Sequence, residues 1–473
     1  MPTIKTTENS LGTKPLGSLL ISLALPAVIA NIVNALYNIV DQIFIGQGMG
    51  KLGNASTNVS FPLTTICMAI GLMVGLGSAS AFNLELGKKN EKRAGRIAGT
   101  AAVMLVISGI IISILVRIFL RPLLILFGAT ENIMPYAVDY AGITSIGIPF
   151  LMFSTGINPL VRADRSSGYS MAAVVSGAIL NLILDPIFIF SLDWGIKGAA
   201  WATVISQIIS ALMLAVYFTR FRSVSFKLSD FIPKPIEIGY ICRLGFNTFI
   251  FQFSNLLVQI VMNNGLRAYG EKSIYGADTP IAAAGIVMKL TVIYFALING
   301  LIHGAQPVCS YNYGAMKYSR VRETVKLFIR IAVIISAVIW LIFEFFPKPL
   351  ISLFGNAEGD ALYVEFAVRF MRVYMFFAFI NGIQICSATF FPAIGKAAKG
   401  TILSFAKQLL FRVPLLLILP RFFGLDGVMY AQPVTDLLSF LIAVLFLIDE
   451  LRKMPREDFG DNPRPTRLRL LHM

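Results

Sequence analysis

Charged residues are scarce in this 473-residue chain. Asp, Glu, Lys and Arg make up 14% of it, while 56% of its residues are hydrophobic. Soluble globular proteins are about a quarter charged, so this composition argues against a soluble fold. The ten-residue segments of alternating hydrophobicity that build membrane β-barrels are also missing. The composition therefore indicates an integral membrane protein whose spans are helices.

Residues suited to metal, disulfide or nucleophilic chemistry are few as well. The two histidines and four cysteines are His303, His472, Cys67, Cys242, Cys309 and Cys386. The cysteines lack the C-x-x-C spacing of zinc sites and redox pairs. No G-x-x-x-x-G-K-[ST] phosphate loop occurs, and no Ser–His–Asp or Cys–His arrangement stands out. These absences argue against an ATP-driven pump, a histidine metal centre and an enzyme.

Long apolar runs are what the sequence has in abundance. A helix needs about 20 apolar residues to cross the hydrocarbon core of a bilayer, and twelve such runs follow one another. They lie at 16–45, 57–82, 97–120, 136–159, 171–189, 198–218, 236–262, 281–302, 327–346, 363–385, 402–419 and 428–448. The first run is too long for a cleavable signal peptide, so we expect it to remain in the mature protein. The predicted fold is an all-α polytopic membrane protein with twelve transmembrane helices.

The formal net charge of +15 is unevenly distributed along the chain. With a cytoplasmic N-terminus, about 26 of the 40 Lys and Arg residues fall on the cytoplasmic side, as the positive-inside rule requires. Two segments that contribute strongly are GKKNEKRAGR and RFRSVSFKLSDFIPKP. The charge therefore indicates membrane topology and argues against nucleic-acid binding. We expect a multi-pass protein of the inner (cytoplasmic) membrane with both termini in the cytoplasm.

The two halves of the chain resemble each other at a nearly constant offset. GSASAFNLELGKK from Gly77 lies opposite GAQPVCSYNYGAM from Gly304, and RPLLILFG lies opposite KPLISLFG at the same offset of 227. WGIKGAAWAT matches FGLDGVMYAQ at an offset of 229. Because each half holds six spans, the repeats are parallel, as in several transporter classes. The predicted organisation is two six-helix lobes, at 1–219 and 236–450, with a cytoplasmic linker at 220–235 and a basic cytoplasmic tail at 451–473.

The first span carries a stripe of polar residues that ends in a carboxylate. Asn31, Asn34, Asn38 and Asp41 are spaced 3, 4 and 3 residues apart, so a helix places them on one face. That face should point to other helices or to water, because an acid in the bilayer centre costs about 2.5–3.5 kcal/mol or more. A single Asn is often only an interhelical hydrogen-bond donor, whereas the buried Asp favours a functional role.

The fifth and sixth spans supply partners for Asp41 at a similar depth. Asn181 and Asp185 lie four residues apart on the fifth span, and Thr203 lies about one turn into the sixth. Their carboxylate, amide and hydroxyl oxygens suit protons and hard cations, and Asp41 with Asp185 would hold a sodium ion. Two neighbouring carboxylates also resist ionising together. The four residues form the predicted cation-coupling site.

The second half carries charges of its own inside predicted spans. Lys289 lies in the eighth span and Asp436 in the twelfth, each about eight residues from the outer end. They either form a structural ion pair or leave Lys289 free to line a central cleft, because an unpaired buried charge costs several kcal/mol. Lys407 and Arg412 on the eleventh span either reach the cleft or snorkel toward an interface.

Three motifs and the doubled architecture together resemble the multidrug and toxic compound extrusion (MATE) family. The motifs are VDQIFIG, NLILDPIFIF and QPVCSYNYGA, and the similarity covers about residues 16–448. The resemblance implies a V-shaped fold and export of cationic, amphipathic compounds in exchange for sodium ions or protons. Ion-linked residues of the prokaryotic DinF-like branch fall here on Asp41, Asn181, Asp185 and Thr203. A bend of the first helix at Pro26 is also implied.

The chain departs from NorM-like members, which carry acids in the seventh and tenth helices. Here the seventh helix offers Gln252, Asn255 and Gln259, and the tenth offers Asn381 and Gln384. We therefore place ion coupling in the N-terminal lobe. The residues expected to line the substrate cleft are Asn34, Tyr37, Asn38, Gln252, Asn255, Gln259 and Lys289.

The function predicted from the sequence is a proton- or sodium-coupled antiporter that exports cationic amphipathic drugs or toxic compounds. We expect a monomer embedded in membrane lipid, without a cofactor and without nucleic acid. A flippase for lipid-linked oligosaccharides or lipids of the same superfamily is the first alternative. It would need a cationic cavity, to which Lys289, Lys407 and Arg412 would contribute. A receptor or scaffold that does not transport is the second alternative.

Overall fold

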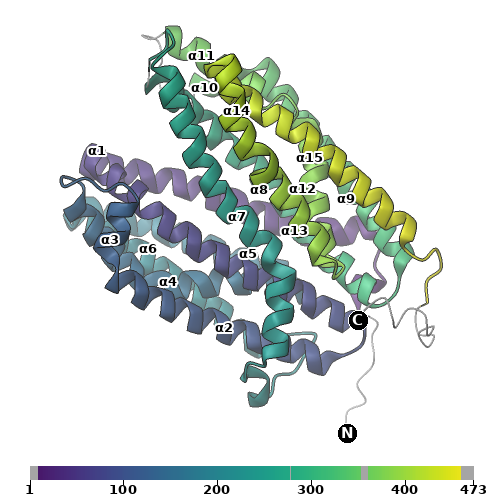
Figure 1. The fold of residues 1–473 in the computed structure, drawn as a ribbon. Coiled ribbons are helices and arrows are strands. Elements are labelled where there is room, and N and C mark those ends of the chain that lie inside the picture. The colour runs from purple at the N-terminus through teal and green to yellow at the C-terminus, as the bar shows by residue number, and fades with distance from the viewer. Residues whose placement is uncertain (1–8, 277, 353–360, 460–473) are drawn as a thin grey trace.

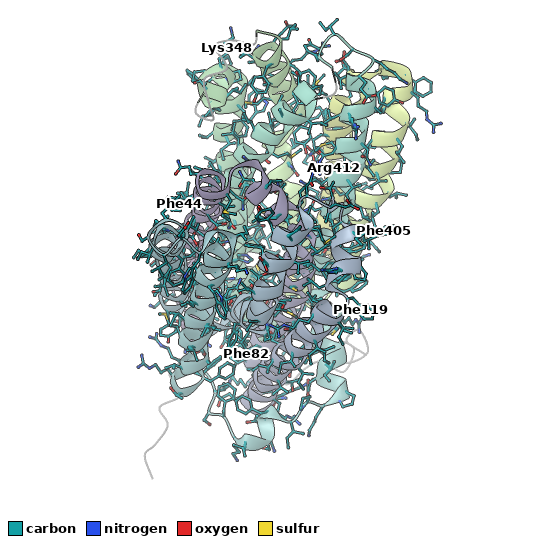
Figure 2. The ribbon with its side chains drawn as sticks, turned by 90° about the vertical axis from the view of Figure 1, so that its left-hand side faces the viewer. Phe44, Phe82, Phe119, Lys348, Phe405 and Arg412 are labelled. Carbon is teal, nitrogen blue, oxygen red and sulfur yellow. The ribbon has the colours of Figure 1, made fainter. Side chains whose placement is uncertain are left out.

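The computed structural model describes residues 9–276, 278–352 and 361–459, and its regular elements are helices. They form two bundles, the N-lobe (α1 to α6) and the C-lobe (α7 to α15) (Figure 1). The bundles converge at the end where α1 begins and α15 ends, and they diverge toward the opposite end (Figure 1). Large apolar side chains such as Phe119 and Phe405 are exposed on the outside (Figure 2), as expected of lipid-facing helices.

The N-lobe contains six spans. Its elements are α1 (Leu16–Gly87), α2 (Glu91–Ile118), α3 (Leu120–Leu126), α4 (Met134–Ala163), α5 (Ser167–Pro186), the π-helical turn η2 (Ile187–Ser191) and α6 (Gly195–Tyr217). The label α1 covers two spans, Leu16–Gly50 and Leu52–Gly87. The chain turns between them at Gly50, whose φ of 63° and ψ of −150° favour a residue without a side chain.

The C-lobe repeats this plan, with one span among its described residues broken by a bend. Its elements are α7 (Pro235–Gly270), α8 (Asp278–Gly314), α9 (Tyr318–Phe345), α10 (Pro347–Ser352), α11 (Ala361–Tyr374), α12 (Ala378–Ala393), α13 (Ala397–Phe405), the π-helical η5 (Ala406–Arg412), α14 (Val413–Phe423) and α15 (Leu425–Lys453). The α11 and α12 helices bend by 50° against each other. The predicted span at 363–385 therefore corresponds to a bent pair of helices, and neither Pro nor Gly marks this break in the sequence.

The structure agrees with the twelve-helix, two-lobe fold class. Ten described helices are long and apolar enough to cross a membrane, and the bent α11–α12 pair raises the number to eleven. The 29-residue α15 lies outside that number and packs against α12 and α14 as the twelfth helix of the bundle. Its apolar run is interrupted by Gln432 and Asp436, which the tertiary structure buries inside the C-lobe.

Small residues bring the lobes together at the convergent end. A Cβ added to Gly304 of α8 would lie 2.5 Å from the backbone of Ala24 in α1, and one at Gly300 would lie 2.6 Å from Cα of Val28. Such close backbone approach is how helices associate when lipid removes the hydrophobic driving force. Further along α1, Asn31 donates to the carbonyl of Ala296 at 3.4 Å.

Two short segments cross from one lobe to the other at this end. The turn η1 (Ser10–Gly12) precedes the N-lobe, yet its fully buried Leu11 packs into the C-lobe core, and Asn312 donates to the Leu11 carbonyl at 2.9 Å. Conversely, η4 (Leu228–Phe231) and the start of α7 pack on the N-lobe helix α2. There Arg93 Nε lies 3.3 Å from Glu237 Oε1. Each lobe is thus held by the segment that leads into the other.

Candidate functional site

The N-lobe residues expected to couple ions are brought together between α1, α5 and α6. Asp41 is 8% exposed, Asn181 is 2% exposed and Asp185 is fully buried. Asp41 lies on the first span of α1, beyond the Asn31 contact and toward the end where the lobes diverge. The matched depth predicted from helix direction is therefore what the fold produces for these side chains.

The two carboxyl groups contact each other directly. The side chains of Asp41 and Asp185 lie close enough to interact with each other, and two carboxyl groups this close resist ionising together. Asn181 Nδ2 donates to Asp185 Oδ1 at 3.3 Å, and Gln42 Nε2 donates to Asp41 Oδ2 at 3.4 Å. Among the described residues, no Lys or Arg forms an ion pair with either carboxyl group.

Unpaired oxygens point to what this cluster can bind. Asp41 Oδ1, Asn181 Oδ1 and Asp185 Oδ2 are buried and accept no hydrogen bond. Buried acceptors without partners are costly, and a proton or a hard monovalent cation satisfies them. Within the described residues, no group of three or more His, Cys, Asp or Glu side chains is arranged for a metal ion. A sodium ion would therefore rely on amide and hydroxyl oxygens beside the two acids.

Two tyrosines complete the cluster, and one of them is absent from the sequence prediction. Tyr140 of α4 lies beside Thr203, and it is close enough to interact electrostatically with Asp41 and Asp185. Tyr37 interacts with the same two acids. Thr203 thus reaches the cluster through Tyr140. The position of Tyr140 near the outer end of the fourth predicted span was the available signal.

The asparagines of the first span, Asn31, Asn34 and Asn38, do not all have the same surroundings. Asn31 reaches across to the C-lobe, Asn34 is half-buried, and Asn38 is exposed and donates to the Asn34 carbonyl of its own helix at 2.6 Å. Only Asp41 turns toward α5. The four positions share one side of the helix, yet its two ends have different neighbours, Asn31 the C-lobe and Asp41 the N-lobe helix α5.

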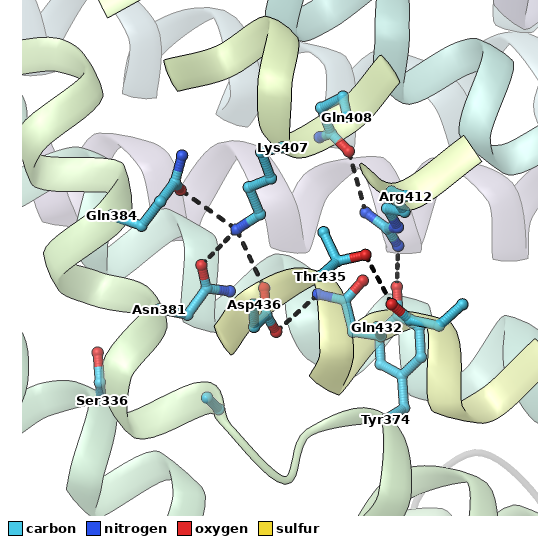
Figure 3. A network of polar contacts seen from close by, with 12 residues as sticks. Ser336, Tyr374, Asn381, Gln384, Lys407, Gln408, Arg412, Gln432, Thr435 and Asp436 are labelled. Atoms are coloured by element: carbon cyan, nitrogen blue, oxygen red, sulfur yellow. Dashed lines mark hydrogen bonds and ion pairs between the residues drawn. The ribbon is translucent and has the colours of Figure 1, made fainter. Parts of the chain in front are cut away.

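The C-lobe holds a second buried polar network, centred on Lys407 (Figure 3). Lys407 Nζ lies 3.2 Å from Asp436 Oδ1, donates to Gln384 at 3.2 Å and also donates to Asn381. The predicted pair between Lys289 and Asp436 is wrong, because Lys407 takes that position and Lys289 is exposed. The expectation that Lys407 lines the cleft or snorkels is also wrong, since the side chain is 3% exposed.

Arg412 and Asn255 extend the network on one side of Lys407. Arg412 donates to Gln408 at 3.4 Å and to the hydroxyl of Tyr374, and its guanidinium lies 5.7 Å from the centre of that ring. Gln408 in turn donates to Asn255 at 2.7 Å. Figure 2 shows Arg412 on the side of the C-lobe nearest the N-lobe, whereas Lys348 lies at the far end.

The remaining cleft candidates lie on helix faces that contact the other lobe nearer the chain ends. Gly245 of α7 packs against the backbone of Met73 in α1, and Gln252 and Gln259 follow it at intervals of seven on the same face. Gln252 is half-buried and Gln259 is exposed. Lys289 likewise shares a face of α8 with Ala296 and Gly300, which contact α1.

Two lobes of membrane-spanning helices, one of them enclosing a pair of buried acids, are the architecture of a polytopic membrane transporter. The model of the MatE family matches residues 26–187 and 272–418, which is more than half of the chain. The chain belongs to this family. Its members are transporters and not enzymes.

Curated relatives and solved structures agree with this assignment. The chain is 26% identical over 430 residues to the multidrug export protein MepA of Staphylococcus haemolyticus, covering 91% of this chain and 92% of that protein. It superposes with a TM-score of 0.88 and 22% identity on a MOP superfamily transporter from Pyrococcus furiosus, covering 95% and 98% of the two chains. A MATE transporter described as outward-facing matches with the same TM-score, identity and coverage.

Proposed function

We propose that this protein is a proton- or sodium-coupled antiporter that exports cationic, amphipathic compounds across the cytoplasmic membrane as a monomer. The relatives named as multidrug export proteins support the export of drugs. The observation that carries the coupling is the contact between Asp41 and Asp185, which lack a basic partner among the described residues. Organic cations are complementary to an acidic N-lobe of this kind.

Exchange follows from the chemistry of the acid pair. A proton or sodium ion at Asp41 and Asp185 removes the repulsion between the carboxylates and favours one arrangement of α1 against α5. Loss of that ion restores the repulsion and favours another arrangement. Because an ion shifts the equilibrium only by its differential affinity for the two states, Asp41 and Asp185 are the residues whose substitution should uncouple transport.

The direction of export rests on the proposed topology. With both termini in the cytoplasm, the convergent end of the lobes is cytoplasmic and the divergent end faces outward (Figure 1). Asp41 then lies toward the outer side, where it exchanges ions with the exterior. Asn34, Tyr37 and Asn38 lie on α1 close to Asp41, so they are positioned to contact the exported compound.

Transport in liposomes tests this function. Purified wild type and Asp41→Asn are reconstituted, and uptake of a fluorescent organic cation is followed under a pH gradient and then under a sodium gradient. We expect the wild type to respond to one gradient and Asp41→Asn to fall to the level of empty liposomes. Asp139→Asn is the matched control, because this exposed N-lobe acid only pairs with Lys197 at 3.4 Å and surface pairs contribute little.

Two results would contradict the proposal in different ways. If folded Asp41→Asn transports like the wild type, Asp41 is structural and the coupling site is wrong. If the wild type moves no organic cation under either gradient, a flippase for anionic lipid headgroups becomes the favoured function. Arg412 and the exposed Lys289 support that alternative, because neither forms an ion pair with a carboxylate among the described residues.

A further inference from the structure

The ammonium group of Lys407 is surrounded by oxygen atoms from two other helices (Figure 3). Asn381 and Gln384 of α12 provide amide oxygens, and Asp436 of α15 provides a carboxylate oxygen 3.2 Å from Nζ. These are the oxygen types that bind hard cations in proteins. The ammonium group donates hydrogen bonds to the two amide oxygens and forms an ion pair with the carboxylate oxygen, so Lys407 occupies a cage of three oxygens.

This cage is closed and electrically balanced. Lys407, Asn381, Gln384 and Asp436 are 2–4% exposed. The second oxygen of Asp436 accepts from Gln432 at 2.9 Å, so the amide fixes the carboxylate in place. Lys407 and Asp436 contribute one positive and one negative charge. Without the lysine the cage would carry a single negative charge, which matches a monovalent ion.

The two lobes carry polar residues at corresponding positions of the repeat but balance their buried charge differently. At the repeat offset of 227, Asn181 and Asp185 fall opposite Gln408 and Arg412, and at 229 Thr203 falls opposite Gln432. Each lobe therefore builds a polar cluster on its fifth and sixth helices. In the N-lobe the acids lack a basic partner among the described residues, whereas in the C-lobe the chain supplies its own cation. A π-helical turn lies at each cluster, η2 directly after Asp185 and Pro186, and η5 around Lys407.

We propose that the Lys407 ammonium is a tethered cation that occupies a monovalent-cation site formed by Asn381, Gln384 and Asp436. Removal of this side chain opens the site to an alkali-metal ion. In the native protein no ion exchanges here, so the C-lobe keeps one fixed charge state while the N-lobe acids change theirs.

The thermal stability of purified variants tests the site without relying on transport. The parent is Asp41→Asn, which disables the proposed N-lobe site, and Lys407→Ala is added to it. Melting temperatures are measured while choline chloride is replaced by sodium, potassium or lithium chloride at constant ionic strength. We expect the melting temperature of the Lys407→Ala protein to rise by several degrees and to level off by about 100 mM salt. Mass action requires this of an ion that binds the folded state. The melting temperature of the parent should not rise.

Asp436→Asn shows whether any salt-dependent rise in melting temperature comes from an ion bound in the cage. Added to Lys407→Ala, it removes the carboxylate of the cage, and we expect the gain to disappear. A folded Lys407→Ala protein that does not respond to the three salts overturns the proposal, and so does a gain that survives Asp436→Asn.

A second variant covers the case in which Lys407→Ala does not fold. Lys407→Met with Asp436→Asn removes both charges while keeping the shape of the side chains, a replacement that buried ion pairs often tolerate. We expect this protein to fold, to ignore sodium at the C-lobe and to transport with the ion dependence of the wild type. A folded double variant that has lost its ion dependence overturns the proposal, because the pair would then take part in exchange. A wild type that does not transport refutes the proposed function and leaves the binding experiment intact.

Discussion

At the scale of single residues, the two lobes differ in whether a buried acid is paired with a basic residue. Asp41 and Asp185 contact each other without a basic partner among the described residues, while Asp436 is matched by Lys407. Two neighbouring acids resist ionising together unless a proton or cation joins them, whereas the Asp436 carboxylate is balanced by the charge of Lys407. The N-lobe is therefore where we expect ions to bind and leave, and Tyr140 is the residue that connects Thr203 to that place.

Tyr140→Phe isolates the contribution of this hydroxyl. It keeps the ring but removes the hydroxyl group beside Thr203, and loss of one hydrogen-bonding group, worth about 1 kcal/mol, corresponds to a several-fold change in an equilibrium. We expect gradient-driven transport to fall several-fold with little change in melting temperature. Tyr136→Phe, one turn away on α4, is the control. Equal transport by the two variants would show that Tyr140 only fills space.

Lys407→Met alone should destabilise the protein more than Lys407→Met combined with Asp436→Asn does. It leaves Asp436 buried with only the Gln432 hydrogen bond, and breaking one side of a buried pair costs about 3–5 kcal/mol. We expect a clear drop in melting temperature, and Asp436→Asn in the same chain should restore most of it. The measurement is a double-mutant cycle on detergent-purified protein. Additive effects of the two substitutions would contradict the pairing.

At the scale of helices, close packing of small residues decides where the lobes touch. Gly304 and Gly300 of α8 let α1 approach to backbone contact at Ala24 and Val28. Pro26 lies between these two residues, inside a helix that continues past it to Gly50. The bend at Pro26 stays a prediction, and its place directly at the interlobe contact means that any bend would move the lobes relative to each other.

Gly304→Ala tests this contact with a control in the same helix. The added methyl group would lie 2.5 Å from the backbone of Ala24, whereas a Cβ at Gly285 meets nothing within 4 Å. We expect Gly304→Ala to lower the melting temperature and weaken the convergent end. Gly285→Ala should be neutral or slightly stabilising, because Ala favours helix over Gly by up to about 1 kcal/mol. Equal effects of the two would mean that the lobes do not depend on this contact.

At the scale of the whole molecule, the lobes are joined by segments that cross between them. Leu11 and Lys14 are held by Asn312 and Arg320 of the C-lobe, and Arg320 donates to the Lys14 carbonyl at 2.8 Å. Glu237 is held by Arg93 of the N-lobe. Because the segments lead into opposite lobes, separating the convergent end requires both contacts to break. Their strength therefore helps to set the population of the conformation seen here.

Glu237→Gln should loosen this end, and a native cysteine reports the change. Cys242 of α7 is half-buried beside the interlobe contact of Ile241 with Gly77, while the other three cysteines are buried. We expect Glu237→Gln to raise the rate of Cys242 modification by a maleimide several-fold, because a neutral amide holds Arg93 less strongly than a carboxylate. Glu323→Gln, an exposed acid on α9, is the control. An unchanged rate would show that the pair does not keep the end closed.

Much of the fold could be predicted from the sequence because membrane spans are local features. Length and hydrophobicity of a run suffice to mark a span, and the repeat offset relates Gly77 to Gly304, both of which lie at the observed interlobe contact. The break after Tyr374 had no local marker. The span of α15 was predictable only because its polar residues are few.

The candidate site was also predictable only in part. Asp41, Asn181 and Asp185 were predictable, because an acid in an apolar helix is costly and helix direction fixes its depth. The partners of Lys407 were not, because Lys289 and Lys407 both lie in predicted spans and depth alone does not say which way a helix is rotated. Rotation about the helix axis depends on packing against several neighbours at once.

Composition, span lengths and the internal repeat were enough to predict a helical membrane protein of two parallel halves with acids in its first lobe. Those properties follow from composition, periodicity and repetition, which each segment carries on its own. The packing of the helices was needed to show that Asp41 and Asp185 are neighbours, that Tyr140 lies between Thr203 and these acids, and that Lys407 rather than Lys289 pairs with Asp436. The physical reason is that charge pairing depends on distances of a few ångströms between helices far apart in the chain, and their packing sets those distances.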